Sequence, residues 1–287
     1  MLPWFRRYAV TLALCLQLPL LGVLKLGQHG ADGSAAECNH IAYPASVLPG
    51  AGPLTIAFFA DVHNHAALFN KAVEEVEKAK PDLIIFGGDF VMADQRFMRT
   101  RWVVKGFERL TRVAPVFAVL GNQDYEKLEQ MERVLNSAGV RLLRNEAVDW
   151  QTPSGATLRI IGLGDWNEGD ERPQDCMSRQ KTEGQPVLLL SHDPESRWLL
   201  RGYAWDMMLS GHTHGGQIGI PFLNRCLSFR SSMPAGDFSF EGDRRVFVTR
   251  GLGSIWGMRF FCPPEVNIIR IGLPPESSCP KGVCGEE

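Results

Sequence analysis

Residues 54–63 read Leu-Thr-Ile-Ala-Phe-Phe-Ala-Asp-Val-His, an apolar run that ends in an aspartate and a histidine. A short apolar run bounded by polar residues predicts a buried β-strand, so we expect a strand over 54–60. Asp61 and His63 would then follow that strand directly. In α/β domains the loops after the strands carry the ligand-binding residues. This stretch therefore predicts both a strand of the sheet and part of a functional site.

Similar short apolar runs recur along the chain and alternate with helical stretches. We predict further strands at Leu83–Phe86, Val116–Leu120, Leu158–Ile161, Val187–Leu190, Met207–Leu209, Val246–Val248 and Val266–Ile271. Apolar residues at helical spacing predict helices over 68–79, 95–112, 124–138 and 194–201. This alternation indicates an α/β domain whose sheets are covered by helices.

Polar motifs follow five of the predicted strands. They are Asp61-Val62-His63, Gly88-Asp89, Gly121-Asn122-Gln123-Asp124, Ser191-His192-Asp193 and Gly211-His212-Thr213-His214. Carboxylates, imidazoles and an amide form a mixed ligand set that suits Mn, Fe or Zn better than Ca or Mg alone. Each motif alone has an ordinary explanation as a turn, a helix cap or a core histidine. Together, in this order and at strand ends, they predict a metal site.

The pattern DxH, GD, GN, H, GHxH resembles the signature of calcineurin-like metallophosphoesterases, and the similarity spans residues 54–273. Residues 211–217 and 249–253, with Arg259-Phe260 and Pro264-Glu265, further resemble a branch of exported or membrane-tethered bacterial members. That branch includes a UDP-2,3-diacylglucosamine pyrophosphatase. The resemblance implies a four-layer αββα sandwich, in which two packed mixed sheets are flanked by helices.

The same resemblance implies two divalent metal ions (Mn, Fe or Zn) at the strand ends. One ion would be held by Asp61, His63, Asp89 and His214, and the other by Asp89, Asn122, His192 and His212, with Asp89 bridging. Two cations ~3.5–4 Å apart polarise a phosphoryl group and activate water. We expect Asp89, Asn122, Gln123 and His212 to act in catalysis.

Gln123 departs from the family pattern, because most members carry a histidine after the Gly-Asn pair. A glutamine donates a hydrogen bond but cannot supply a proton. General acid catalysis is worth ~10²–10⁴-fold, so we predict weak activity towards poor, alkoxide-like leaving groups. Cleavage that releases a phosphate or nucleotide would lose little of its rate without a general acid. His65 either replaces the missing acid or is a solvated loop residue.

The composition and the motifs narrow the function to a hydrolase. A net charge of −2 gives no electrostatic reason to expect nucleic acid as a partner. We expect hydrolysis of a phosphoester or pyrophosphate bond in a small-molecule or lipid-linked, membrane-proximal substrate, in its sharpest form UDP-2,3-diacylglucosamine. A generic exported phosphodiesterase is the alternative within the same chemistry. A non-catalytic scaffold is the alternative of another class, although such proteins usually lose metal ligands.

The N-terminal segment predicts membrane attachment. Arg6 and Arg7 precede a nearly charge-free run from Tyr8 to Leu24, which is long enough to span ~30 Å of bilayer at 1.5 Å per residue. We expect residues 1–26 to be a single-pass anchor in a bacterial inner membrane, with a cleaved signal as the alternative. The two arginines favour an outward catalytic domain, whereas lipid A precursors are made on the cytoplasmic face, so the side stays open.

The remaining segments complete the predicted organisation. Residues 27–53 read as a linker, 54–273 as the catalytic domain and 274–287 as a flexible tail, where Cys279 and Cys284 could pair in an oxidising compartment. The apolar run 255–261 reads either as a groove in which Arg259 grips a phosphate or as a core strand. Residues 166–184 read as a surface insertion able to border the site.

Overall fold

A computed structural model of the chain describes residues 28–29, 36–92, 101–220, 225–227, 231–255 and 259–274. The expected anchor or signal over 1–26, the two tail cysteines and nearly all of the expected tail lie outside these ranges. Within them, no helix is both long and apolar enough to cross a membrane. The membrane attachment and its sidedness therefore stay predictions.

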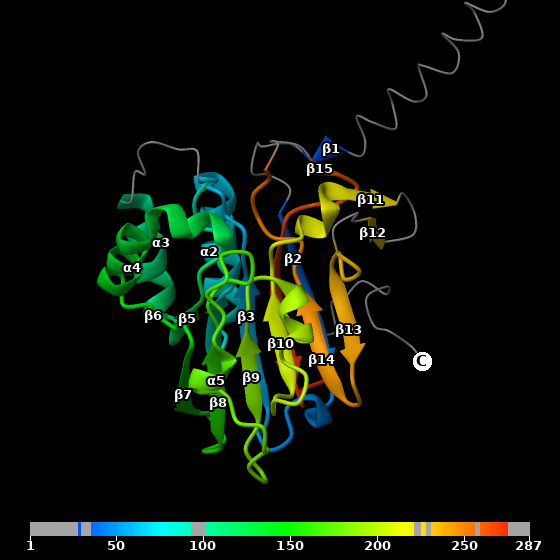
Figure 1. The fold of residues 1–287 in the computed structure, drawn as a ribbon. Coiled ribbons are helices and arrows are strands. Elements are labelled where there is room, and N and C mark those ends of the chain that lie inside the picture. Colours follow the sequence, from blue (N-terminus) through cyan, green and yellow to red (C-terminus); the bar gives the residue numbers. More distant parts are fainter. Residues whose placement is uncertain are drawn as a thin grey trace, which may run out of the picture.

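The first of two six-stranded sheets has the order β2-β16-β3-β4-β5-β6 (Figure 1). Its strands are β2 (Glu37–Tyr43), β16 (Glu265–Ile271), β3 (Leu54–Phe59), β4 (Leu83–Phe86), β5 (Val116–Ala118) and β6 (Arg141–Leu142). The last four are parallel to one another, and β16 runs antiparallel to β3. Since β3, β4 and β5 point the same way, the loops after them meet at one edge of the sheet.

The sheet begins before Leu54, which differs from the predicted linker over 27–53. Strand β2 pairs in parallel with β16 over seven positions, from Glu37 opposite Glu265 to Tyr43 opposite Ile271. It is an edge strand of sequence Glu-Cys-Asn-His-Ile-Ala-Tyr, in which only Tyr43 is buried. A strand that buries so little lacks the apolar run by which the other strands were predicted.

The second sheet has the order β13-β14-β10-β9-β8-β7. Its strands are β7 (Glu146–Gln151), β8 (Thr157–Gly162), β9 (Val187–Leu190), β10 (Met207–Ser210), β13 (Gly236–Phe240) and β14 (Arg244–Val248). Strands β8, β9, β10 and β14 are parallel, and the two outer strands are antiparallel to their neighbours. The loops after β9 and β10 thus leave this sheet at the same end.

A small third sheet caps that end of the sandwich (Figure 1). It consists of β1 (Gln28–His29), β15 (Arg259–Phe260), β11 (Ile218–Ile220) and β12 (Arg225–Leu227). Gln28 pairs with Phe260, and Phe260 also pairs with Ile218 on its other side. The small sheet therefore lies next to the loop that follows β10.

Two hydrophobic layers hold the first sheet in place. Its inner face packs against the second sheet, for example where Phe58 meets Phe247 edge to face at 6.2 Å between ring centroids. Its outer face is covered by α2 (Ala66–Ala79), α3 (Arg101–Thr111) and α4 (Leu128–Ser137) (Figure 1). Three of the predicted helices are these, with the turn η2 (Asn122–Lys127) preceding α4. Residues 95–100 of the helix predicted over 95–112 lie outside the described residues.

The outer face of the second sheet carries a thinner layer than predicted. It is covered by loops with a one-turn helix α5 (Pro173–Cys176) and a 3₁₀ turn η3 (Pro194–Trp198), which pack Met177, Leu200 and Trp205 onto the sheet. The helix expected over 194–201 is only this short turn, which ends at Trp198 with Leu199 as its C-cap. The α/β sandwich is confirmed, and its fourth layer is mostly loop.

Candidate metal centre

Five loops bring the predicted site residues together where the two sheets meet. Three loops leave the first sheet after β3, β4 and β5, and two leave the second sheet after β9 and β10. In chain order they carry Asp61 and His63, Asp89, Asn122 and Gln123, His192, and His212 and His214. The centre is therefore built from loops of both sheets, and it forms only when the two sheets pack in this relative position.

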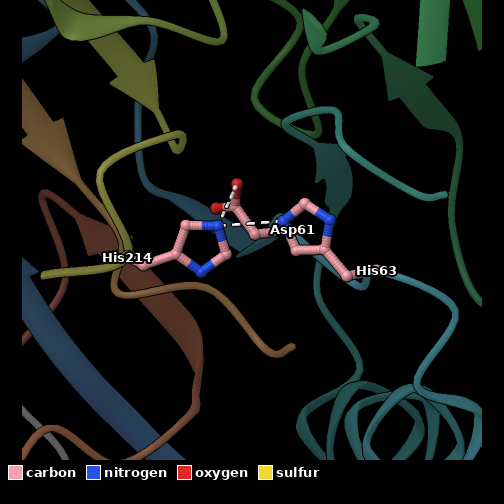
Figure 2. Close-up of side chains that lie close together, drawn as sticks. All are labelled: Asp61, His63 and His214. Carbon is pink, nitrogen blue, oxygen red and sulfur yellow. Dashed lines mark hydrogen bonds and ion pairs between the residues drawn. The ribbon is translucent and has the colours of Figure 1, made fainter. Parts of the chain in front are cut away.

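A first group of donors consists of Asp61, His63 and His214, whose side chains point toward one another (Figure 2). The two Nε2 atoms are 2.9 Å apart, and His214 Nε2 lies 3.5 Å from Asp61 Oδ1. All three residues are buried, and Asp61 Oδ2 has no hydrogen-bond partner. The donor atoms lie within 4.8 Å of one another, so this group could hold one metal ion.

A second group consists of Asp89, His192 and His212. His192 Nε2 faces Asp89 Oδ2 at 3.3 Å but makes no hydrogen bond, while its Nδ1 lies 2.8 Å from the Gly87 carbonyl oxygen. That carbonyl can only accept, so Nδ1 carries a proton and Nε2 is the nitrogen that faces the centre. Asn122 Oδ1 joins the group 3.0 Å from His212 Nδ1.

Asp89 stands between the two groups. Its Oδ2 is 3.3 Å from His192 Nε2 in the second group and 3.7 Å from His63 Nε2 in the first. A carboxylate in this position can serve both groups at once, as the family pattern implies for a bridging ligand. The structure thus brings all seven predicted ligands into one cluster.

The buried donors fit a pair of divalent cations. A buried polar atom without a partner costs about 1–3 kcal/mol, and both Asp61 Oδ2 and His192 Nε2 are in this situation. Carboxylate, imidazole and amide donors are the set that first-row divalent ions accept. The two groups therefore fit one cation each, which would supply the missing partners.

Burial and neighbouring charges shift the pKa values of the cluster. Burial raises the pKa of Asp61 to about 7 against the opposing effect of His192. Burial also opposes ionisation of Asp89, but His192 and His63 outweigh it and lower the pKa of Asp89 to about 2. Burial lowers the pKa of His214, and the nearby His63 adds to this. A water-excluded site that crowds like charges in this way is typical of functional centres.

The backbone of the centre is held in an uncommon conformation. Asp61, His63, Asp89, His212 and His214 all have φ between 46° and 67°, which costs ~1–3 kcal/mol per non-glycine residue. The motif glycines make room for the facing carboxylates. A Cβ on Gly121 would lie 2.3 Å from Asp89 Oδ1, and one on Gly211 would lie 2.6 Å from Asp61 Oδ2.

Asp124 is a structural part of the centre that the sequence analysis left without a role. Its buried carboxylate accepts four backbone N–H groups, from Gly121 at 3.1 Å, Asp89 at 2.9 Å, Phe90 at 2.9 Å and Val91 at 3.2 Å. It therefore fixes the loop that carries Asp89. The available signal was its place as the acidic residue three positions after Gly121, where a capping box puts one.

Of the two readings of 255–261, the structure places Arg259 in a buried strand, β15, and not in position to grip a phosphate. Only 1% of it is exposed, and its guanidinium donates to the backbone oxygens of Gly253 at 3.0 Å and Arg250 at 2.7 Å. The nitrogen that donates to Arg250 also lies 3.2 Å from His214 Nδ1. Arg259 thus ties the loop of 249–253 to the first group. Residues 256–258 of the predicted apolar groove lie outside the described residues.

Gln123 and His65 take positions that bear on proton transfer. The Gln123 backbone N–H donates to Asp89 Oδ1 at 2.9 Å, so its side chain starts beside the shared carboxylate. His65 precedes α2, and its Nδ1 accepts the Leu68 N–H at 3.3 Å as the cap of that helix. His65 is therefore occupied as a helix cap, which argues against its replacing the missing acid.

Comparisons with known proteins show which family and which relatives the chain resembles. A family model described as calcineurin-like phosphoesterase matches residues 54–216. The chain is 33% identical over 230 residues to the phosphodiesterase YaeI of Escherichia coli K12, covering 77% of this chain and 83% of that protein. It is 28% identical over 282 residues to the UDP-2,3-diacylglucosamine pyrophosphatase LpxG of Chlamydia trachomatis serovar D, covering 76% and 83% respectively. A dimetal phosphatase from Danio rerio gives a TM-score of 0.44 at 14% identity, over 71% of this chain and 88% of that one.

Proposed function

Because this chain belongs to the calcineurin-like phosphoesterase family and is a metal-dependent phosphohydrolase, we propose that it cleaves a pyrophosphate or phosphodiester bond in a lipid-linked substrate. The observation that carries the chemistry is the pair of buried donor groups that share Asp89, with Asp61 Oδ2 and His192 Nε2 unpartnered. UDP-2,3-diacylglucosamine is the substrate that we propose to test first.

The chain's own residues divide the work of such a reaction. Asp61, His63 and His214 would hold one cation and His192, His212 and Asn122 the other, with Asp89 between the two groups. When bound, the two cations supply Lewis-acid polarisation of the phosphoryl group and lower the pKa of water. The side chain of His212 is 26% exposed, whereas those of Asp61 and His192 are fully buried. The substrate phosphate therefore reaches the centre from the His212 side.

Gln123 favours a substrate with an acidic leaving group. Its side chain starts beside Asp89 and can donate a hydrogen bond to the phosphoryl group, but no proton passes from an amide to the leaving oxygen. A nucleotide or phosphate leaves readily without protonation, whereas an alkoxide does not. The relative LpxG is named as a pyrophosphatase, which supports the pyrophosphate form of the proposal.

The predicted N-terminal anchor supports a substrate at a membrane. The apolar run ends at Leu24, four residues before Gln28, and four residues span at most ~14 Å. Gln28 belongs to the small sheet, which continues from the loop that carries His214 (Figure 1). If the run is inserted in a bilayer, the centre lies close to the bilayer surface.

A generic exported phosphodiesterase is the second candidate, because the relative YaeI is named as a phosphodiesterase. The two candidates share every residue of the centre and differ in the substrate and in the expected side of the membrane. A non-catalytic scaffold does not agree with the complete set of ligands.

One assay separates these candidates. The full chain is supplied with Mn²⁺ and given either UDP-2,3-diacylglucosamine in mixed micelles or bis-p-nitrophenyl phosphate. Asp89→Ala is the inactive variant. Asp206→Asn is the matched control, since Asp206 is a buried aspartate that accepts the Val187 N–H at 2.8 Å in the same sandwich. We expect metal-dependent release of UMP that Asp89→Ala abolishes and Asp206→Asn retains. Efficient diester cleavage without UMP would refute the lipid pyrophosphate and favour the second candidate.

A further inference from the structure

His212 presents its two ring nitrogens to two different partners. Nδ1 lies 3.0 Å from Asn122 Oδ1, on the side of the second donor group, and Nε2 lies 3.5 Å from Asp193 Oδ2. A histidine that binds a metal through one nitrogen carries its proton on the other, and a carboxylate there fixes the orientation of the ring. A cation placed between Nδ1 and Asn122 Oδ1 would be offered a lone pair by each of them, and the ring proton would then lie on Nε2, facing Asp193.

Asp193 is itself held in place by both of its carboxylate oxygens. Oδ1 accepts the Glu195 N–H at 2.8 Å as the cap of η3, and Oδ2 accepts Asn167 Nδ2 at 2.9 Å. Asp193 is 4% exposed. Asn167 belongs to the segment 166–184, which the sequence predicted as a surface insertion able to border the site. That segment is therefore connected to the centre through Asp193.

The ring of His212 needs such support more than the other ligands do. Its side chain is 26% exposed, compared with 0% for His192 and 2% for His214. Packing confines the two buried rings, whereas a partly exposed ring can rotate away from the metal position. The contact with Asp193 restricts rotation of the His212 ring, which packing alone does not restrict.

From these contacts we infer that Asp193 is a positioning residue for His212 and that Asn167 holds Asp193 in place. The inference rests on the proposed two-metal centre. Asp193 acts through His212 on the second metal position only, because its carboxylate faces none of Asp61, His63 or His214 in the contacts described. Loss of such a partner typically weakens metal binding ~10–100-fold.

The test uses Asp193→Asn in the full chain. The asparagine keeps the size of the side chain, and its oxygen can still cap η3. Its amide then presents a donor to Nε2–H, which has no acceptor left there. Mn²⁺ binding is measured by titration calorimetry, and the bound metal is counted by elemental analysis after dialysis against buffered Mn²⁺. Thermal unfolding of the metal-free proteins checks the fold.

We expect the wild type to bind two equivalents of Mn²⁺. In Asp193→Asn, one Mn²⁺ should bind with its wild-type affinity and the other with an affinity ~10–100-fold lower. Asn167→Ala should weaken the same equivalent by less, and Asp206→Asn should bind as the wild type does. Unchanged Mn²⁺ dissociation constants in Asp193→Asn would overturn the inference. Equal weakening of both Mn²⁺ sites together with a lowered unfolding temperature would also overturn it, because that result indicates a role in capping η3 alone. Fewer than two equivalents in the wild type would overturn the two-metal centre itself.

Discussion

Replacement of Asp124 by asparagine should destabilise the loop that carries Asp89. The wild-type carboxylate accepts two N–H groups on each oxygen: those of Gly121 and Asp89 on Oδ2, and those of Phe90 and Val91 on Oδ1. An amide has one oxygen and one NH₂ group. Whichever way it is turned, two of the four buried N–H groups lose their acceptor and face a donor.

The magnitude follows from these two lost acceptors. Each buried group left without a partner costs about 1–3 kcal/mol, so Asp124→Asn should lower the free energy of unfolding by about 2–6 kcal/mol. Whole domains have free energies of unfolding of about 5–15 kcal/mol, so we expect the variant to fold but with lower stability. Burial raises the pKa of Asp124 to about 7, and the comparison is therefore made at pH 8.5, where the wild-type side chain is ionised.

The assay is urea unfolding of the metal-free proteins, followed by Mn²⁺ counting on the folded forms. Asp206→Asn is again the control, because its amide oxygen can turn to the Val187 N–H and only the ion pair with Lys181 is lost. We expect the free energy of unfolding to fall much more in Asp124→Asn than in Asp206→Asn, and we expect Asp124→Asn to bind Mn²⁺ more weakly. A free energy of unfolding within about 1 kcal/mol of that control would refute the assignment of Asp124 as the support of this loop.

Three further changes test other parts of the structure. Gln123→His should raise the rate on diesters with poor leaving groups by up to ~10²-fold and change pyrophosphate cleavage little, measured as kcat on paired substrates; equal gains on both would refute the role given to Gln123. Gly251→Ala should destabilise more than Gly155→Ala, because both glycines have positive φ but only at Gly251 would the new Cβ lie 2.6 Å from Asp61 Cβ. Strain alone costs about 1–2 kcal/mol, and equal unfolding midpoints would contradict the predicted clash. Burial raises the pKa of Glu171 from 4.5 to about 7, so the folded protein keeps this proton longer than the unfolded chain does and stability falls as pH rises between those values. Glu171→Gln should remove up to about 3 kcal/mol of that fall, seen as a flatter profile of unfolding free energy against pH.

The donor set of the centre could be predicted from the sequence because it depends on local patterns. Apolar runs such as Leu54–Phe59 mark buried strands, and the polar residues that end them are fixed in position by the strand itself. Since the carboxyl ends of parallel strands meet at one edge, residues such as Asp61 and Asp89 converge although they are far apart in the chain. The family pattern added which residues should share a metal.

The supports of that centre were decided by the tertiary structure alone. Strand β2 buries too little to show an apolar pattern and becomes visible only through its pairing with β16. Asp193 meets His212, and Arg259 meets His214, only because loops from different strands approach each other. A charged side chain has the same appearance in a sequence whether it is solvated or buried against a ligand. The sequence therefore predicts which groups can bind metal, whereas three-dimensional packing decides which residues hold them in position.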